Sequence, residues 1–190
     1  MTKILGISGS LRRDSYNSRL LEAAASLLPG GVEFELYRGL KSVPPYDQDD
    51  DVEPPPRAVA RLREALSAAD GVLIATPEYN SSIPGVLKNA LDWASRPLMT
   101  NPLRFRPVAV CGASTGAFGA VWAQAELRKV LAAMGARVVE AEVPVGHAPN
   151  RFDEDGLLVD EEIREQLVAL VEALLAGIAE RRESTAPVAA

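Results

Sequence analysis

The chain has 190 residues, the length of one ordinary domain, and 47% of them are hydrophobic while 24% are charged, a balance that excludes global disorder. The 20 Lys and Arg against 26 Asp and Glu give a formal net charge of −6, which argues against a nucleic-acid binder because such proteins present a basic face to phosphates. One cysteine, Cys111, and one histidine, His147, exclude an internal disulfide and a metal site built from cysteine and histidine.

Short apolar runs along the chain predict five β-strands. The predicted strands are residues 3–8, 32–37, 71–76, 108–113 and 137–143. The third and fourth runs are almost continuously apolar, which is typical of strands that are covered on both faces.

Between the strands, apolar residues recur at helical spacing and predict five helices. The predicted helices contain residues 20–28, 59–66, 86–94, 121–134 and 163–178. Strands that alternate with helices indicate an α/β protein with a doubly wound parallel sheet. We expect five strands in the flavodoxin-like order 2-1-3-4-5, with helices on both faces.

The pattern contains no internal repeat and no domain linker, so residues 1–182 are expected to form a single domain. Residues 183–190 are expected to be a disordered tail. Residues 107–125 carry no charge, almost the length of a membrane span, but the glycines and hydroxyl residues in their middle favour a strand, a loop and a helix. With no signal-peptide pattern at the N-terminus, we expect a cytoplasmic protein that does not cross a membrane.

Ligands of an open parallel sheet bind beyond the carboxyl ends of its strands, so the loops after the first, third and fourth strands are the candidate binding loops. The first loop, GSLRRDSYN at residues 9–17, lacks the Gly-Lys-Ser/Thr of a Walker A loop and the spaced glycines of a dinucleotide fingerprint. It can bind one phosphate, because a helix start favours an anion and Arg12 can add paired hydrogen bonds. The alternative is an ordinary capped helix start, with Ser15 or Asn17 as the N-cap; the position at the sheet edge favours phosphate.

The other two loops offer groups to a planar ligand at the same edge. After the third strand, the sequence PEYNSSIPG begins with Glu78, Tyr79 and Asn80, which can present an aromatic edge and amide donors; the alternative is a well-capped loop. After the fourth strand, CGASTGAFG contains three glycines that allow close backbone approach. Cys111 is expected to be a buried, inert thiol and His147 a loop residue, so we predict no catalytic side chain and no metal ligand.

The three loops together resemble the NADPH-dependent FMN reductase family, which includes flavodoxin-like quinone, chromate and azo-dye reductases. The resemblance rests on GSLRRDSYN, PEYNSSIPGVLKNALDW and GASTGAFG and covers residues 3–146. It implies that FMN is the cofactor and that NADPH or NADH is the hydride donor. The residues implied to hold the FMN phosphate are Ser10, Arg12, Ser15, Asn17 and Ser18. Those implied to contact the isoalloxazine ring are Pro77, Glu78, Tyr79, Asn80, Ser114 and Gly116.

The resemblance also implies a homodimer or homotetramer that passes hydride from NADPH through FMN to a quinone or a similar small acceptor in a ping-pong cycle. Such a cycle needs no side-chain nucleophile, because the flavin carries the chemistry. Arg12, Arg13 or Arg38 can meet the 2′-phosphate that distinguishes NADPH from NADH. Two other functions remain open: an FMN electron carrier that does not oxidise NADPH, and an interaction module that binds no flavin.

Overall fold

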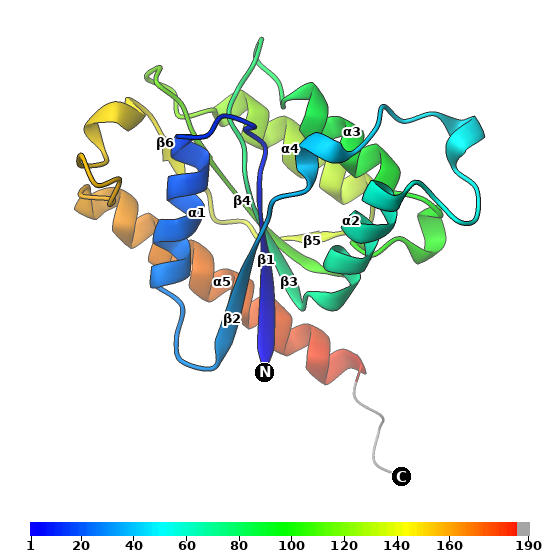
Figure 1. The fold of residues 1–190 in the computed structure, drawn as a ribbon. Helices are drawn as coiled ribbons and strands as arrows, with labels where there is room; N and C mark the ends of the chain where they lie inside the picture. Colours follow the sequence, from blue (N-terminus) through cyan, green and yellow to red (C-terminus); the bar gives the residue numbers. More distant parts are fainter. Residues whose placement is uncertain (186–190) are drawn as a thin grey trace.

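The computed structural model of the protein (Figure 1) describes residues 1–185 and contains the predicted parallel sheet. The strand order is β2-β1-β3-β4-β5, with β6 paired to β4. This confirms the flavodoxin-like order 2-1-3-4-5 and adds a sixth strand. The strands are β1 Thr2–Ser8, β2 Val32–Tyr37, β3 Gly71–Ala75, β4 Pro107–Ala113, β5 Arg137–Val138 and β6 Pro144–Val145.

Helices cover both faces of the sheet (Figure 1), as predicted. One face packs against α1 and α5, and the other against α2, α3 and α4. The alternation of side chains along β3 shows how one strand serves both cores, because Val72 and Ile74 belong to one cluster and Leu73 and Ala75 to the other. The helices are α1 Tyr16–Ser26, α2 Arg57–Ala68, α3 Gly85–Ala94, α4 Val121–Ala133 and α5 Glu161–Thr185.

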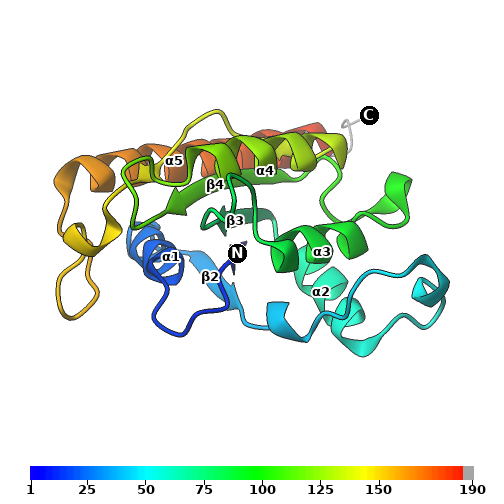
Figure 2. The same ribbon diagram turned by 90° about the horizontal axis from the view of Figure 1, so that it is seen from above.

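The register of the central strands aligns the carboxyl ends that carry the candidate loops. Ile7 of β1 lies opposite Tyr37 of β2 on one side and Ile74 of β3 on the other. In Figure 2, which looks at the molecule from above, the loops after these strands lie over the end of the sheet. Single turns of 3-10 helix lie in the connections, at Leu40–Ser42, Gln48–Asp50, Leu98–Thr100 and Ala148–Asn150.

The predicted fifth strand, residues 137–143, is interrupted. Its ladder on β4 ends where the N–H of Val139 donates to the carbonyl of Val108 at 2.9 Å, and pairing resumes at β6. Between the two strands the carbonyls of Val139 and Ala141 accept hydrogen bonds from the guanidinium of Arg128 on α4. An arginine therefore satisfies the backbone carbonyls that a continuous strand would have paired.

The chain end differs in one detail from the expected domain boundary at residue 182. Residues 183–185 are the last residues of α5, and residues 186–190 of the predicted tail lie outside the described residues. The uncharged stretch of residues 107–125 forms β4, a loop and the start of α4. Within residues 1–185, no helix is long and apolar enough to cross a membrane.

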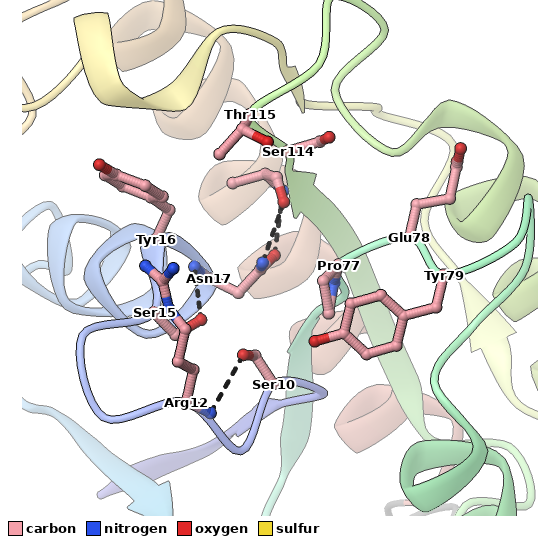
Figure 3. A pocket seen from close by; sticks show the side chains of 11 residues that line it. Ser10, Arg12, Ser15, Tyr16, Asn17, Pro77, Glu78, Tyr79, Ser114 and Thr115 are labelled. Atoms are coloured by element: carbon pink, nitrogen blue, oxygen red, sulfur yellow. Dashed lines mark hydrogen bonds between the residues drawn. The ribbon is translucent and has the colours of Figure 1, made fainter.

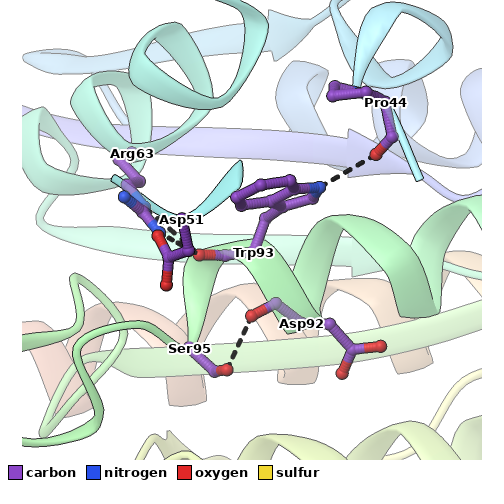
Figure 4. Close-up of polar contacts among 6 residues, drawn as sticks. All are labelled: Pro44, Asp51, Arg63, Asp92, Trp93 and Ser95. Carbon is purple, nitrogen blue, oxygen red and sulfur yellow. Dashed lines mark hydrogen bonds and ion pairs between the residues drawn. The ribbon is translucent and has the colours of Figure 1, made fainter. Parts of the chain in front are cut away.

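Trp93 on α3 belongs to the core and has no exposed surface (Figure 4). Its indole N–H donates to the carbonyl of Pro44 at 2.9 Å, and its own carbonyl accepts from Arg63, which pairs with Asp51. On the same helix, Lys88 and Asp92 form an i,i+4 ion pair at 2.7 Å. Helix α3 is thus fixed through both its side chains and its backbone.

Candidate functional site

An open cavity of about 180 Å³ lies where the loops after β1, β3 and β4 meet (Figure 3). Its lining contains eight of the predicted ligand residues: Ser10, Arg12, Ser15, Asn17, Pro77, Glu78, Tyr79 and Ser114. It also contains Tyr16, Ala113 and Thr115, while Ser18, Asn80 and Gly116 lie outside the lining. Three loops far apart in the sequence therefore form one site, at the edge where the sheet topology places it.

The loop after β1 caps helix α1 at the wall of the cavity. Ser15 is the N-cap of α1, and its hydroxyl accepts from the N–H of Asn17 at 3.2 Å. Tyr16, the first helical residue, lines the cavity, so the positive end of the helix dipole lies at the cavity wall. Arg12 is exposed, donates to the carbonyl of Asp14 at 2.6 Å and lies 5.7 Å from the ring centroid of Tyr16. The capped helix start is thus present, and it is compatible with the predicted phosphate-binding role of the same segment.

Asn17 connects this loop to β4. Its side-chain amide donates to the carbonyl of Ala113 at 3.0 Å, and its side-chain oxygen accepts from the N–H of Ala113 at 3.0 Å. The side chain is 3% exposed. These two bonds occupy both ends of the amide, so Asn17 holds two loops of the site together through its side chain.

The loop after β3 turns sharply at residues 79–82. Tyr79 and Ser82 exchange backbone hydrogen bonds at 3.0 and 3.1 Å, and Asn80 and Ser81 between them both have positive φ. In Figure 3 the ring of Tyr79 extends across the cavity, whereas the carboxylate of Glu78 points away from it. The tip of the turn therefore carries Asn80 outside the cavity, and Tyr79 supplies the aromatic surface.

Glu78 caps the N-terminus of α4, which lies more than 40 residues further along the chain. Its carboxylate accepts from the N–H of Trp122 at 3.1 Å and from the N–H of Ala123 at 3.0 Å, both in the first turn of α4. A carboxylate at a helix N-terminus satisfies free N–H groups and interacts favourably with the dipole. The second and third loops are thereby joined on the side of the cavity opposite the first loop.

Close packing explains two glycines of the third loop. A Cβ on Gly119, which has a φ of +59°, would lie 2.4 Å from the carbonyl carbon of Pro144, and a Cβ on Gly112 would lie 2.8 Å from the carbonyl oxygen of Thr76. A Cβ on Gly116 would meet only the hydroxyl of Ser114, at 3.5 Å, which is an ordinary contact, and the Gly116 N–H donates to that hydroxyl at 3.1 Å. The loop is shaped by backbone contact with β3 and β6, and Ser114 is oriented by its own turn.

Neither the single cysteine nor the single histidine lines the cavity. Cys111 is completely buried, and burial raises the pKa of its thiol to about 12, so the thiol stays protonated at neutral pH. His147 is exposed on a loop, where its backbone N–H donates to the carbonyl of Gly116 at 2.9 Å. Among residues 1–185, no cluster of three His, Cys, Asp or Glu is placed to hold a metal ion.

Three lining residues were not among the predicted contacts. Tyr16 directly follows the N-cap, and that position was a usable signal because the first residue of a helix faces whatever binds at its N-terminus. The sequence signal at Thr115 is its hydroxyl alone. Ala113 carries no chemical signal in its side chain, and it enters the lining as the last residue of β4.

Comparison with known proteins decides the family. The sequence model described as NADPH-dependent FMN reductase matches residues 2–150, which is most of the chain. The chain belongs to the NADPH-dependent FMN reductase family. It is thus an oxidoreductase by family, as its three loop motifs indicated.

Within this family, the chain is 46% identical over 173 residues to an NAD(P)H-dependent FMN reductase of Pseudomonas aeruginosa, covering 90% of this chain and 92% of the relative. It is 41% identical over 181 residues to a 2-hydroxy-1,4-benzoquinone reductase of a Burkholderia species, covering 95% and 98%. Among solved structures, the flavoenzyme NAD(P)H:(acceptor) oxidoreductase FerB of Paracoccus denitrificans superimposes with a TM-score of 0.83 at 34% identity, covering 95% of this chain and 99% of FerB. The similarity therefore extends over nearly the whole reductase in each case.

Proposed function

We propose that this protein oxidises NADPH with FMN as its cofactor and reduces a quinone or a similar small planar acceptor in a ping-pong cycle. The observation that carries the proposal is that one cavity combines two kinds of groups. Hydroxyl and guanidinium groups beside the start of α1 could hold an anion, and an aromatic side chain and a hydroxyl from the other two loops could contact a ring. The relatives named for FMN and benzoquinone reduction support the same cofactor and acceptor class.

The cavity fits a phosphorylated flavin in the chemistry of its donors. Ser10, Arg12 and Ser15 lie beside the start of α1 and would hold the phosphate, since a helix N-terminus with hydroxyl and guanidinium donors favours a dianion. Pro77, Tyr79 and Ser114 belong to the rest of the lining and would contact the ring. Bound FMN supplies the acceptor for a hydride and the donor for the second substrate.

The protein's own side chains position the ligands and shape the cavity around them. They do not react themselves. Asn17 and Glu78 tie the three loops together by their hydrogen bonds, so the walls of the cavity are fixed before ligands bind. Tyr79 is 54% exposed, which leaves an aromatic surface at the mouth where planar substrates would stack. The two substrates would use this mouth in turn, which is the basis of the proposed ping-pong order.

Steady-state kinetics test that order. With FMN-saturated protein, varying NADPH at several fixed quinone concentrations should give parallel double-reciprocal lines. Intersecting lines would require both substrates to bind together and would contradict the ping-pong cycle. An FMN electron carrier, which the acidic composition also suits, would bind FMN and show no NADPH oxidation at all.

We also propose that the protein works in the cytoplasm as a homodimer or homotetramer. The apolar residues Ile83 and Trp93 are buried in the core, whereas Leu98, Met99 and Phe105 are 47%, 68% and 53% exposed. Exposed apolar side chains of this size favour burial between subunits. Light scattering on the purified protein tests the proposal, and a monomeric mass at micromolar concentration would contradict it.

A further inference from the structure

A second cavity, of about 280 Å³, adjoins the one described above. It lies where β1 and β2 end, and it shares Ser10 and Arg12 with the first cavity. In Figure 3, both residues lie at the lower border of the first cavity. The proposed function assigns the FMN phosphate to these two residues, so the second cavity begins where FMN would end.

The lining of this second cavity is basic. It contains Arg12, Arg13, Arg38 and Lys41 and no carboxylate, although acidic residues outnumber basic ones by 26 to 20 in the sequence. Arg13, Arg38 and Lys41 are exposed, and within residues 1–185 no ion pair or side-chain hydrogen bond joins them to another group. Cations that gather without neutralising partners raise the local positive potential, so this basic cavity favours an anion.

The rest of the lining adds hydroxyl groups and an aromatic ring. Ser18, which the resemblance assigned to the FMN phosphate, lies outside the first cavity and lines the basic cavity, where its hydroxyl donates to that of Ser8 at 3.2 Å. Tyr37 is half-buried in the lining, and a Cβ on Gly39 would lie 2.6 Å from its phenolic oxygen. The basic cavity thus offers donors to a phosphate and an aromatic side chain to a nucleobase.

We propose that the basic cavity binds the adenylyl half of flavin adenine dinucleotide (FAD), so that the protein accepts FAD as well as FMN. FAD is FMN joined through its phosphate to adenosine 5′-monophosphate. With the FMN phosphate at Ser10 and Arg12, the second phosphate would meet the cations of the basic cavity and the adenine would contact Tyr37. The inference rests on the proposed function in the place that it gives to the FMN phosphate.

The shared border of the two cavities favours a ligand that occupies both. A separate anion would pay the full cost of association, whereas an adenylyl group attached to a bound flavin is held at a high effective concentration. The FMN phosphate loses a negative charge when it becomes part of the pyrophosphate of FAD. Contacts of the second phosphate with Arg13, Arg38 and Lys41 would compensate for that loss.

The direct test is a competition between the two flavins for the full-length protein. The protein is equilibrated with an excess of FMN and FAD at equal concentrations, and the bound flavins are released by denaturation and quantified by chromatography. We expect at least as much bound FAD as bound FMN. FMN as the predominant bound flavin would overturn the proposal, because the adenylyl group would then gain nothing from the basic cavity.

Matched variants locate the contact. R38A combined with K41A should lower the ratio of bound FAD to bound FMN about tenfold or more, the factor expected from the loss of a hydrogen bond to a charged group, and should leave the binding of FMN alone unchanged. R57A removes an exposed arginine at the start of α2, outside the basic cavity, and should preserve the ratio. An unchanged ratio in R38A with K41A, or an equal fall in R57A, would contradict the assigned site.

Adenosine 5′-monophosphate distinguishes an attached adenylyl group from a free nucleotide. Calorimetry with FMN-saturated protein should show binding much weaker than micromolar, because the free nucleotide lacks the flavin that anchors it. Micromolar affinity would identify a free nucleotide as the occupant of the basic cavity and overturn the assignment to FAD.

The outcomes separate this inference from the proposed function. If FAD binds through the basic cavity but NADPH does not reduce the bound flavin, the adenylyl site stands and the reductase proposal fails. If NADPH reduces bound FMN while FAD is excluded, the reductase proposal stands and the adenylyl site fails.

Discussion

At the scale of single residues, Arg12 is the cation that the cavity between the three loops offers to the proposed FMN phosphate. Among the residues that line that cavity, no other carries a positive charge. Its guanidinium is exposed and contacts the carbonyl of Asp14 and the ring of Tyr16. It can therefore turn toward a phosphate without breaking a buried contact.

Replacing Arg12 by alanine should weaken FMN binding without affecting riboflavin. A hydrogen bond to a charged group contributes roughly 1.5–3 kcal/mol, which corresponds to about a 10- to 150-fold loss of FMN affinity. Riboflavin has the same ring without the phosphate, so its affinity should stay constant in a fluorescence titration. R13A is the matched control, since Arg13 is the neighbouring cation and does not line the cavity between the three loops. If R12A weakens both ligands equally, Arg12 supports the shape of the loop instead.

Cys111 and His147 should be dispensable for turnover. The thiol is buried with a pKa of about 12, and the imidazole lies on an exposed loop outside the cavity lining. C111A and H147A should therefore keep most of the kcat in an NADPH–quinone assay, and intact protein should resist alkylation of the thiol at neutral pH. A thousandfold loss of kcat in either variant would mean that a side chain takes part in the chemistry.

The residue types of the site were predictable, but the direction of several side chains was not. The hydroxyls, Arg12 and Tyr79 were found from their place after strands. Asn17 and Glu78 were predicted to contact the ligand, but their side chains form hydrogen bonds within the protein. Asn17 bonds to Ala113, 96 residues away in sequence, and Glu78 bonds to the start of α4, about 45 residues away. Such partners depend on tertiary packing, which local patterns do not contain.

At the scale of the elements, helix starts connect the site to the fold. Replacing Glu78 by glutamine keeps the size of the side chain and removes its charge from the N-terminus of α4. The free energy of unfolding should fall by roughly 1 kcal/mol, as for other caps and dipole contacts. E126Q is the matched control, because Glu126 lies on the same helix in a surface pair with Lys129 at 3.6 Å and such pairs contribute little. Urea denaturation that gives the same loss for both variants would contradict the capping role.

Asp160 should make the start of α5 sensitive to acid. The N–H of Ile163 and then the guanidinium of Arg151 hold the pKa of the Asp160 carboxyl below its ordinary value of 3.8. A lowered pKa in the folded state stabilises the protein fully above the unfolded pKa, and this stabilisation is lost as the pH falls through the lower folded value. D160N should therefore be less stable than the parent by roughly 1 kcal/mol at pH 7. The difference in unfolding free energy should shrink as the pH falls below 3.8 and Asp160 becomes protonated in both states, and a difference that does not change with pH would contradict the assignment.

The interrupted fifth strand is an example of a break that the sequence pattern does not predict. The alternating apolar residues of 137–143 are typical of one strand, and the first and last parts of that stretch do lie along β4. At the interruption, Arg128 of the preceding helix donates to the carbonyls of Val139 and Ala141. A contact between a helix side chain and a strand backbone leaves no periodicity in the sequence.

At the scale of the whole molecule, the order of the strands was predictable because right-handed crossovers and buried apolar strands leave few arrangements open. That order also predicted which loops meet, and the cavity formed by the three loops confirms it. The basic cavity beside it combines the end of β2 with the first loop. Its cations are spread over residues 12–41, so only the folded chain shows that they line one space.

The most direct test of the account is the visible absorbance of the FMN-saturated protein mixed anaerobically with NADPH alone. We predict that about one FMN per chain is bound, that its visible band bleaches without any partner reductase, and that a quinone restores the band. A band that NADPH leaves unchanged while dithionite bleaches it would contradict the account, because the protein would then bind FMN without oxidising the nucleotide.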